Sequence, residues 1–178
     1  MIETENMVNA KLGFAEQTFS FGGAKVLTTI GYERSTLDDF IATLVLTGVE
    51  TLVDVRDRAQ SRMRGFSKTA LAEAVRAAGL DYLHMPTLGD PKAGRDAARA
   101  GNFEQFREIY RTVLLSKEAQ LAISDLKNLA VQSRICLMCF ERDQRNCHRK
   151  MVSDLLEDDL GVKTTHLGVQ KGASRRAA

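Results

Sequence analysis

Apolar residues follow two different patterns along the chain. Short runs rich in Val, Ile, Leu and Thr end at Gly, Pro or polar residues, which is typical of buried strands. The predicted strands span residues 25–30, 50–55, 81–85, 134–140 and 163–167. Between them apolar residues recur at helical spacing, which predicts helices. The predicted helices span residues 36–47, 67–78, 103–115, 118–131 and 149–160, and residues 87–102 are predicted to be a long polar connection.

The alternation of strands and helices predicts the fold class. A helix between two strands returns the chain to the same end of the sheet, so neighbouring strands run parallel. We therefore expect a single three-layer α/β domain at residues 25–168, with a mostly parallel sheet of about five strands and helices on both faces. Residues 1–24 are expected to form a loose extension and residues 169–178 a disordered basic tail.

Composition narrows the class of protein. No apolar run reaches the roughly 18 to 20 residues that cross a bilayer, and the acidic residues near Met1 lead us to expect no secretory leader. Three cysteines, all between residues 136 and 147, do not form a disulfide framework and favour a reducing cytoplasm. A net charge of +2 does not by itself indicate nucleic-acid binding. We expect a cytoplasmic protein without a membrane partner.

Parallel sheets of this kind bind ligands beyond the carboxyl ends of their strands. That edge should gather the segments that directly follow the predicted strands. Gly31, Tyr32, Asp54 and Gly89 are then expected to line the cleft, next to residues 139–149.

The segment CLMCFERDQRNCHRK, at residues 136–150, holds all three cysteines and one of three histidines. A zinc site would use Cys136, Cys139, Cys147 and His148, and CxxC is a common zinc spacing. Residues three apart in a strand point to opposite faces, however, which separates Cys136 from Cys139. We therefore predict Cys136 to be a small buried core residue, and we predict no metal and no cofactor.

Two other cysteine sites have partial matches. Cys139 and Arg145 have the C-x5-R spacing of the phosphate loop of cysteine phosphatases. LVDVRD is similar to an early strand of rhodanese-like sulfurtransferases, in which a cysteine loop also precedes a helix. Both loops surround an anion with backbone N–H groups and favour glycine, whereas FERDQ contains none.

A reactive thiol with nearby proton carriers fits the segment better. Cys147 precedes a predicted helix, and a helix N-terminus and the cations Arg149 and Lys150 lower the pKa of a thiol. Glu141 and His148 can carry protons. The predicted catalytic residues are Cys139, Glu141, Cys147 and His148.

Arginines near the same edge predict an anionic ligand. Arg56, Arg62 and Arg149 are the predicted anion-binding residues, because the planar guanidinium fork binds phosphate or carboxylate in two places. We expect the ligand to bear phosphate, and nucleic acid is a possible partner.

At this point the chain resembles a known family. TIGYERSTLDDFIATLVLTGVETLVDVRDRAQSR, DYLHMPTLGD, LMCFERDQRNCHR and TTHL follow in order the motifs of the DUF488 family, a bacterial and archaeal group of unknown function. The resemblance spans residues 27–167, and its most specific part is Cys139-x-Glu141 followed by Cys147-His148-Arg149. It implies the fold and the place of the site. This chain has Tyr32 where the family usually has a histidine, and Ala59 near the place of a common proline.

The leading hypothesis is a cytoplasmic enzyme that acts on a phosphate-bearing small molecule, a nucleotide or a nucleic-acid end through the Cys/Glu/His cluster. One alternative is a non-catalytic nucleic-acid-binding module. Another is a redox sensor in which Cys139 and Cys147 form a reversible disulfide.

Overall fold

One all-parallel sheet forms the centre of the protein. The computed structural model describes residues 26–176, so the extension expected at residues 1–24 lies outside the described residues. The strand order is β3-β2-β4-β1-β5, and every neighbouring pair is parallel. The strands are β1 (Leu27–Gly31), β2 (Thr51–Asp54), β3 (Asp81–His84), β4 (Ile135–Cys139) and β5 (Thr164–Leu167). The predicted fold class is confirmed.

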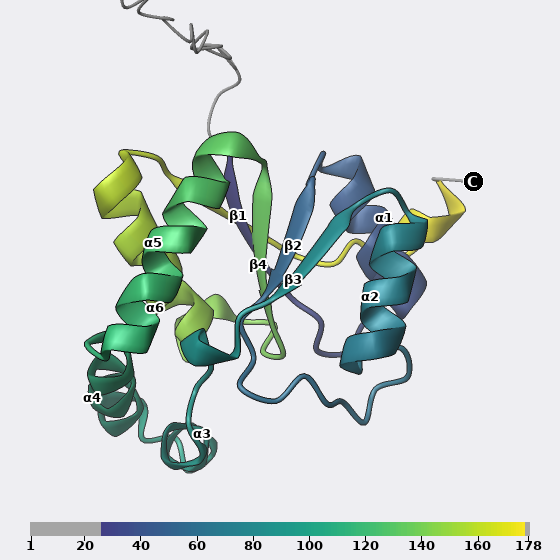
Figure 1. Ribbon diagram of the computed structural model, residues 1–178. Coiled ribbons are helices and arrows are strands. Elements are labelled where there is room, and N and C mark those ends of the chain that lie inside the picture. The colour runs from purple at the N-terminus through teal and green to yellow at the C-terminus, as the bar shows by residue number, and fades with distance from the viewer. Residues whose placement is uncertain (1–25, 177–178) are drawn as a thin grey trace, which may run out of the picture.

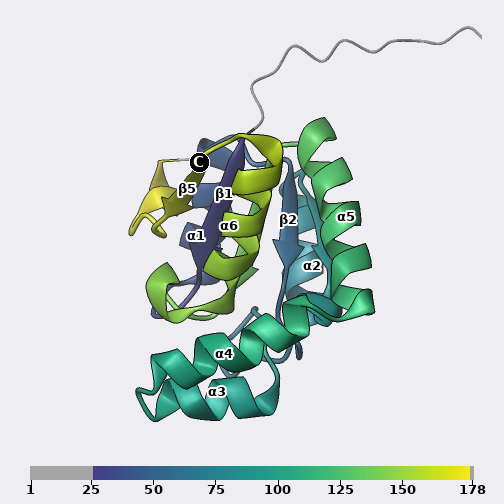
Figure 2. The same cartoon turned by 90° about the vertical axis from the view of Figure 1, so that its left-hand side faces the viewer.

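Helices cover both faces of this sheet (Figure 1). One face carries α1 (Leu37–Leu46) and α2 (Lys68–Ala77), and the other carries α5 (Lys117–Gln132) and α6 (His148–Leu160). Two further helices, α3 (Lys92–Arg99) and α4 (Phe103–Leu114), pack against each other beyond one end of the sheet (Figure 2). Among residues 26–176, no helix has the length and apolar character needed to cross a membrane.

Helix α3 lies where a polar connection was predicted. Its buried residues are Gly94 and Ala97, which form a narrow face of small side chains. Such a face has no large apolar residues to produce a helical period in the sequence, so the pattern did not reveal it. Because α3 and α4 stand beyond the end of the sheet, they cover the edge where the predicted site lies (Figure 2).

The core consists of two apolar layers, one on each face of the sheet. Along β4, Ile135 and Leu137 pack with the layer under α5 and α6, whereas Cys136 and Met138 pack with the layer under α1 and α2. This alternation is the period-2 geometry of a strand. Cys136 is fully buried in the second layer, which confirms its prediction as a core residue.

The register of the strands brings the predicted cleft segments to one edge. Gly31 is the Cα partner of Cys139, and Asp54 is the partner of both Met138 and His84. Residues far apart in the sequence therefore end at the same level of the sheet. The expected convergence at the carboxyl edge is confirmed for β1, β2, β3 and β4.

A disordered tail was expected at residues 169–178, but the structure describes an ordered segment up to Arg176. It contains the short helix η3 (Ala173–Arg175), packs on α1 and buries Ala173 completely. The Asp39 carboxylate accepts hydrogen bonds from the Gly172 amide and from the amide and hydroxyl of Ser174. These bonds, led by the one from Gly172, lower the pKa of Asp39 to about 2. The segment is held by polar contacts to α1, which no apolar period in the sequence signals.

Candidate functional site

Two cysteines and a histidine meet at the carboxyl edge of the sheet. Cys139 is the last residue of β4, Cys147 is the N-cap residue of α6, and His148 is the first residue of that helix. The Nδ1 atom of His148 lies 3.8 Å from the Sγ of Cys139 and 4.0 Å from the Sγ of Cys147. These three atoms all lie within 4.8 Å of one another, and all three residues are buried. We call this group the Cys/Cys/His cluster.

The imidazole of His148 is fixed by a contact on its far side. Its Nε2 atom lies 2.8 Å from the carbonyl oxygen of Val55, the residue after β2. A carbonyl only accepts, so Nε2 carries the proton and donates it. The Nδ1 atom therefore faces the two sulfurs. The ring also packs on Tyr110, with 5.1 Å between ring centroids.

Glu141 stands next to the cluster on the loop between β4 and α6. The thiol of Cys139 donates a hydrogen bond to Glu141 Oε2 at 3.3 Å. The backbone of this loop is held by Arg149, whose guanidinium donates to the carbonyl oxygens of Glu141 (2.5 Å) and Arg142 (3.2 Å). It is also held by Gly31, since a Cβ there would lie 1.8 Å from the Glu141 carbonyl oxygen. The position of Glu141 thus depends on β1 and α6 together.

A cavity of about 290 Å³ opens over the cluster. Cys147, His148 and Glu141 lie on its wall. The α3–α4 pair supplies the opposite side, with Phe103 and Phe106 among the apolar residues. The cavity is therefore a partly apolar chamber with reactive groups on one wall, which is the usual character of a ligand site.

Burial and mutual contacts set the protonation states in the cluster. Contact with Cys147, followed by burial, raises the pKa of Cys139 well above its usual range. Burial would also raise the pKa of Cys147, but the contact with Cys139 and the charge of His148 outweigh it and lower that pKa well below its usual range. Burial opposes the charge of His148, yet the nearby Cys147 thiolate raises its pKa to about 9. These directions favour a thiolate at Cys147, a protonated imidazole at His148 and a neutral thiol at Cys139.

Burial also raises the pKa values of two nearby groups, the Glu141 carboxyl and the Cys136 thiol. Burial, followed by the charge of Cys147, raises the pKa of Glu141 to about 7. Burial raises the pKa of the Cys136 thiol to about 12. The prediction that Cys147 reacts more readily than Cys136 has this electrostatic support and stays a prediction.

Asp90 also lines the cavity, although sequence reasoning did not select it. It is 6% exposed, and its Oδ1 atom has no hydrogen-bond partner within the described residues. Burial raises the pKa of Asp90 to about 6. The carboxyl group lies against Gly94, where a Cβ would come within 2.0 Å of Oδ1. The one feature of the sequence that pointed to Asp90 was its position, because it directly follows Leu88-Gly89 in the segment after the predicted strand at residues 81–85.

The other predicted cleft residues form a buried network beside the cavity. Arg56 donates two hydrogen bonds to the Asp54 carboxylate, from Nε (2.8 Å) and from Nη2 (2.5 Å). Its Nη1 atom donates to the Tyr32 hydroxyl and to the Phe66 carbonyl oxygen, both at 2.9 Å. Tyr82 donates to Asp54 at 2.7 Å. Arg56 is 5% exposed and does not line the cavity. Its role in anion binding stays a prediction, and its contacts in this structure are to protein oxygens.

The remaining predicted positions have different environments. Arg149 is 1% exposed and contacts carbonyl oxygens, as described above. Arg62 lies on an exposed loop and lines neither the cavity nor the hollow described next. Gly89 is needed for close packing, because a Cβ there would lie 2.2 Å from the Asp57 backbone. Arg56 and Arg149 are thus buried against protein oxygens and Arg62 is exposed, and anion binding by these three arginines stays a prediction.

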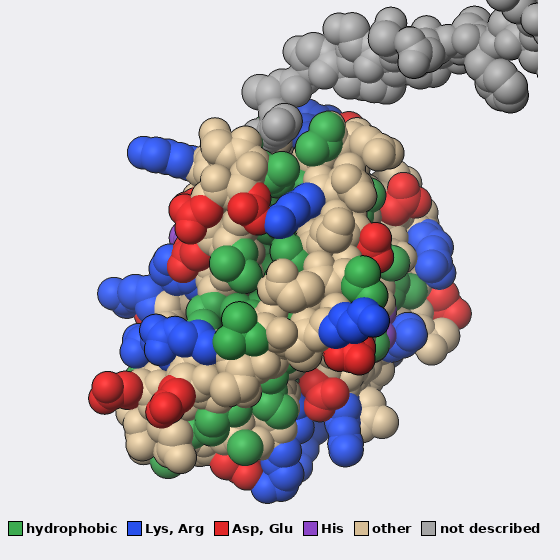
Figure 3. All heavy atoms as spheres, turned by 60° about the vertical axis from the view of Figure 1, so that its left-hand side comes forward, with side chains coloured by type: hydrophobic (Ala, Val, Ile, Leu, Met, Phe, Trp, Pro, Cys, Tyr) green, Lys and Arg blue, Asp and Glu red, His purple; other side chains and the backbone are tan. Residues whose placement is uncertain are grey.

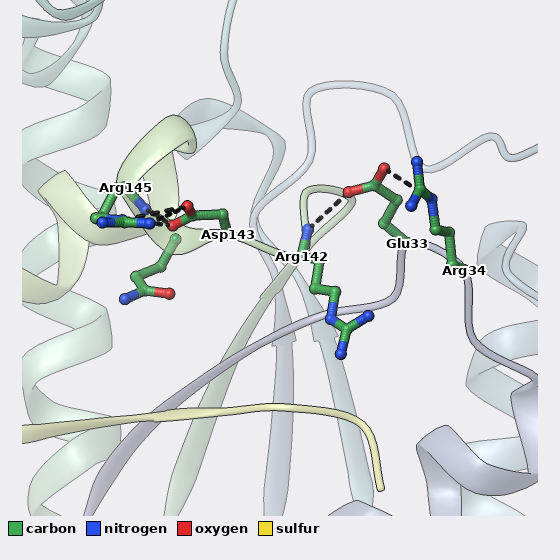
Figure 4. A pocket seen from close by; sticks show the side chains of 6 residues that line it. Glu33, Arg34, Arg142, Asp143 and Arg145 are labelled. Carbon is green, nitrogen blue, oxygen red and sulfur yellow. Dashed lines mark hydrogen bonds and ion pairs between the residues drawn. The ribbon is translucent and has the colours of Figure 1, made fainter. Parts of the chain in front are cut away.

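A shallow hollow adjoins the cavity and contains other arginines (Figure 4). Its volume is about 500 Å³, and it shares Glu33 with the cavity. Arg34 and Arg145 extend into solvent, with 83% and 76% of their side chains exposed. Glu33 contacts Arg34 and accepts a hydrogen bond from the amide of Arg142. On the cavity side, Arg95 and Arg99 of α3 add two further cations.

The chain is thus an α/β protein with a parallel sheet, and the Cys/Cys/His cluster and the Glu141 carboxylate lie together at the carboxyl edge of that sheet. Residues 36–156 match the sequence profile of the family described as Domain of unknown function DUF488, and the chain belongs to this family. No curated protein and no solved structure shows significant similarity to the chain. The resemblance found from the cysteine motifs is thereby confirmed.

Proposed function

We propose that the protein is an enzyme, a hydrolase or transferase, that acts on a small phosphate-bearing molecule, a nucleotide or a nucleic-acid end. One observation carries this proposal. The side chains of Cys139, Glu141, Cys147 and His148 come from a strand end, a loop and a helix start and lie close together, and Glu141, Cys147 and His148 line one cavity. A binding module for phosphate has no use for buried thiols beside a carboxyl group and an imidazole.

Arginines around the opening support an anionic substrate. Arg95 and Arg99 lie on the cavity side, and Arg34, Arg142 and Arg145 lie in the adjoining hollow. Several of these side chains are exposed and salt-bridged only to surface carboxylates, and such pairs contribute little stability. They are therefore free to exchange partners when a phosphate arrives, which the buried Arg56 and Arg149 cannot do without breaking core contacts.

Glu141 is the proton carrier in this proposal. It lies on the cavity wall and contacts the thiol of Cys139, so a substrate in the cavity is within its reach. A carboxyl group in a partly apolar site is suited to take up and return a proton during one reaction. Its backbone is fixed by Gly31 and Arg149, which provides the positional accuracy that proton transfer needs.

The test is a turnover screen with nucleotides, sugar phosphates and short oligonucleotides, followed by substitution of the proton carrier. Glu141→Gln should lower turnover of the compound found by about 100- to 10,000-fold and leave its affinity nearly unchanged. Glu73→Gln, on the exposed side of α2, is the matched control and should behave like the parent. Parent-like turnover by Glu141→Gln would refute the assignment.

A redox sensor is the second candidate, favoured by the closeness of the two sulfurs in the cluster. A thiolate at Cys147 can attack an oxidised Cys139, or the reverse, to form a disulfide. In that case the screen would return no substrate, and mild peroxide would link the two cysteines reversibly. The nucleic-acid module has less support. On the face drawn in Figure 3, basic side chains are interspersed with acidic ones and do not form a continuous stripe.

A further inference from the structure

We infer that the Cys139 Sγ, Cys147 Sγ and His148 Nδ1 atoms bind one Zn²⁺ ion whose fourth coordination position opens into the cavity. The inference deepens the proposed function, because it states how the cluster would promote the reaction. Its structural part, the binding of the metal, does not depend on any activity.

The distances in the cluster fit a tetrahedral ion. With Zn–S bonds of about 2.3 Å and Zn–N bonds of about 2.0 to 2.1 Å, neighbouring sulfur and nitrogen ligands lie about 3.6 Å apart and two sulfurs about 3.8 Å apart. The two sulfur–nitrogen distances here are 3.8 and 4.0 Å, and all three atoms lie within 4.8 Å of one another. Modest movements of the three side chains would complete the coordination.

The surroundings of His148 are those of a metal ligand. Histidines that bind a metal through one ring nitrogen usually donate the other N–H to a carboxylate, a backbone carbonyl or water. His148 does this through Nε2, which lies 2.8 Å from the carbonyl of Val55. The contact leaves Nδ1 directed at both sulfurs, at nearly equal distances. A simple catalytic pair would need the nitrogen near only one of them.

The types of ligand select the metal. Two thiolates and an imidazole are soft and borderline donors that suit zinc, whereas magnesium and calcium require oxygen ligands. Three protein ligands, rather than four, are typical of a catalytic zinc site that keeps one position for water or substrate. Cys147 and His148 line the cavity, so that position can reach it.

A closed structural zinc site would need Cys136 as a fourth ligand, and the geometry of the sheet prevents this. The sequence-based prediction of no metal rested on the separation of Cys136 from Cys139. The structure has Cys136 on the opposite face of the sheet, in the layer under α1 and α2. It brings Cys147 and His148 to Cys139 instead, so a three-ligand site forms without any CxxC pair.

Glu141 has the place of the proton carrier in such a site. In zinc deaminases, a glutamate two residues after a zinc ligand is not itself a ligand and carries protons for the bound water. Glu141 follows Cys139 at the same spacing and lies on the cavity wall. For a phosphate ester, the oxygen of the metal-bound water would bond to phosphorus as its proton passes to Glu141. The bond from phosphorus to the leaving oxygen then breaks, and that oxygen takes the electron pair and the proton from Glu141.

The experiment titrates the reduced, metal-free full-length chain with Co²⁺ alone and then with Zn²⁺ alone. We expect one equivalent of Co²⁺ to produce thiolate charge-transfer absorption and the strong visible bands of a four-coordinate ion, and Zn²⁺ to abolish both. Cys139→Ser and Cys147→Ser should each weaken binding by more than about 100-fold, since loss of an outer-shell partner alone costs about 10- to 100-fold. Circular dichroism checks that each variant is folded.

Cys136→Ala is the matched control, because it removes a cysteine of the same strand from the opposite face. It should bind both ions like the parent. Absence of thiolate bands in the parent, or bands that persist in both folded serine variants, would overturn the metal site. Metal binding without turnover of any screened compound would leave the site standing and remove the proposed function. Full turnover by chelator-treated, metal-free protein would support the enzyme and remove the role of zinc in it.

Discussion

Arg56 offers a direct test of whether the buried arginines serve the fold or bind a ligand. The substitution is Arg56→Met, which keeps a long side chain and removes the guanidinium. In the structure this group contacts the Asp54 carboxylate, the Tyr32 hydroxyl and the Phe66 carbonyl. If the guanidinium serves the fold through those contacts, the free energy of unfolding of the variant falls. If it binds a ligand, the variant mainly loses affinity.

The expected magnitude follows from burial. The side chains of Asp54 and Arg56 are 0% and 6% exposed, so removing Arg56 leaves a carboxylate that water cannot reach. Breaking a buried ion pair in this way typically costs about 3 to 5 kcal/mol. Tyr82 still donates to Asp54, which compensates in part. We therefore expect the free energy of unfolding to fall by about 3 to 4 kcal/mol, at the lower side of that range.

The assay is urea unfolding at pH 7, followed by circular dichroism. Arg58→Met, two residues further on and exposed, is the control and should change stability by less than about 0.5 kcal/mol. Adding Asp54→Asn to Arg56→Met should recover part of the loss, because the unpaired buried charge is then gone. A loss below about 1 kcal/mol in Arg56→Met would refute the structural role.

Two further predictions concern close contacts elsewhere. Gly31→Ala should lower the free energy of unfolding by about 1 to 3 kcal/mol in the same urea assay, because the new Cβ overlaps the Glu141 carbonyl, whereas Gly168→Ala, with open space around it, should not. Asp39→Asn should be less stable than the parent at pH 7. A lowered pKa stabilises the fold fully above the ordinary aspartate value near 4, and the effect disappears as the pH falls through about 2. Urea unfolding at several pH values should therefore show the difference shrinking below pH 4, and a constant difference would contradict the role of the Asp39 charge.

The sheet and its main helices could be predicted because their information is local. Each strand is a short apolar run between breakers, and each helix on the faces of the sheet has large apolar residues at helical spacing. Helix α3 and the C-terminal segment lack this local pattern, and the sequence did not predict either of them. Helix α3 buries only Gly94 and Ala97, and the C-terminal segment is held by hydrogen bonds to Asp39 and Thr43. Neither feature changes the hydrophobic period.

The candidate site could be located from the sequence, but its internal contacts could not. The rule that parallel strands gather their carboxyl ends brought Cys139 near Cys147 and His148. The same rule brought Arg56 to this edge, and it could not distinguish a side chain that points into a cavity from one that turns into the core. That choice depends on Asp54, Tyr32 and Phe66, which surround the guanidinium from separate elements.

The loop after β4 shows why such contacts matter for function. FERDQRN contains no glycine or proline, so its sequence alone does not fix a backbone path. The path is fixed from outside, by the absence of a Cβ at Gly31 and by the two carbonyl contacts of Arg149. Arg149 is buried although it is charged, and such a residue must have its donors satisfied. Its hydrogen bonds to the loop therefore stabilise the core and position Glu141 at the same time, so a change at Arg149 should disturb stability and site together.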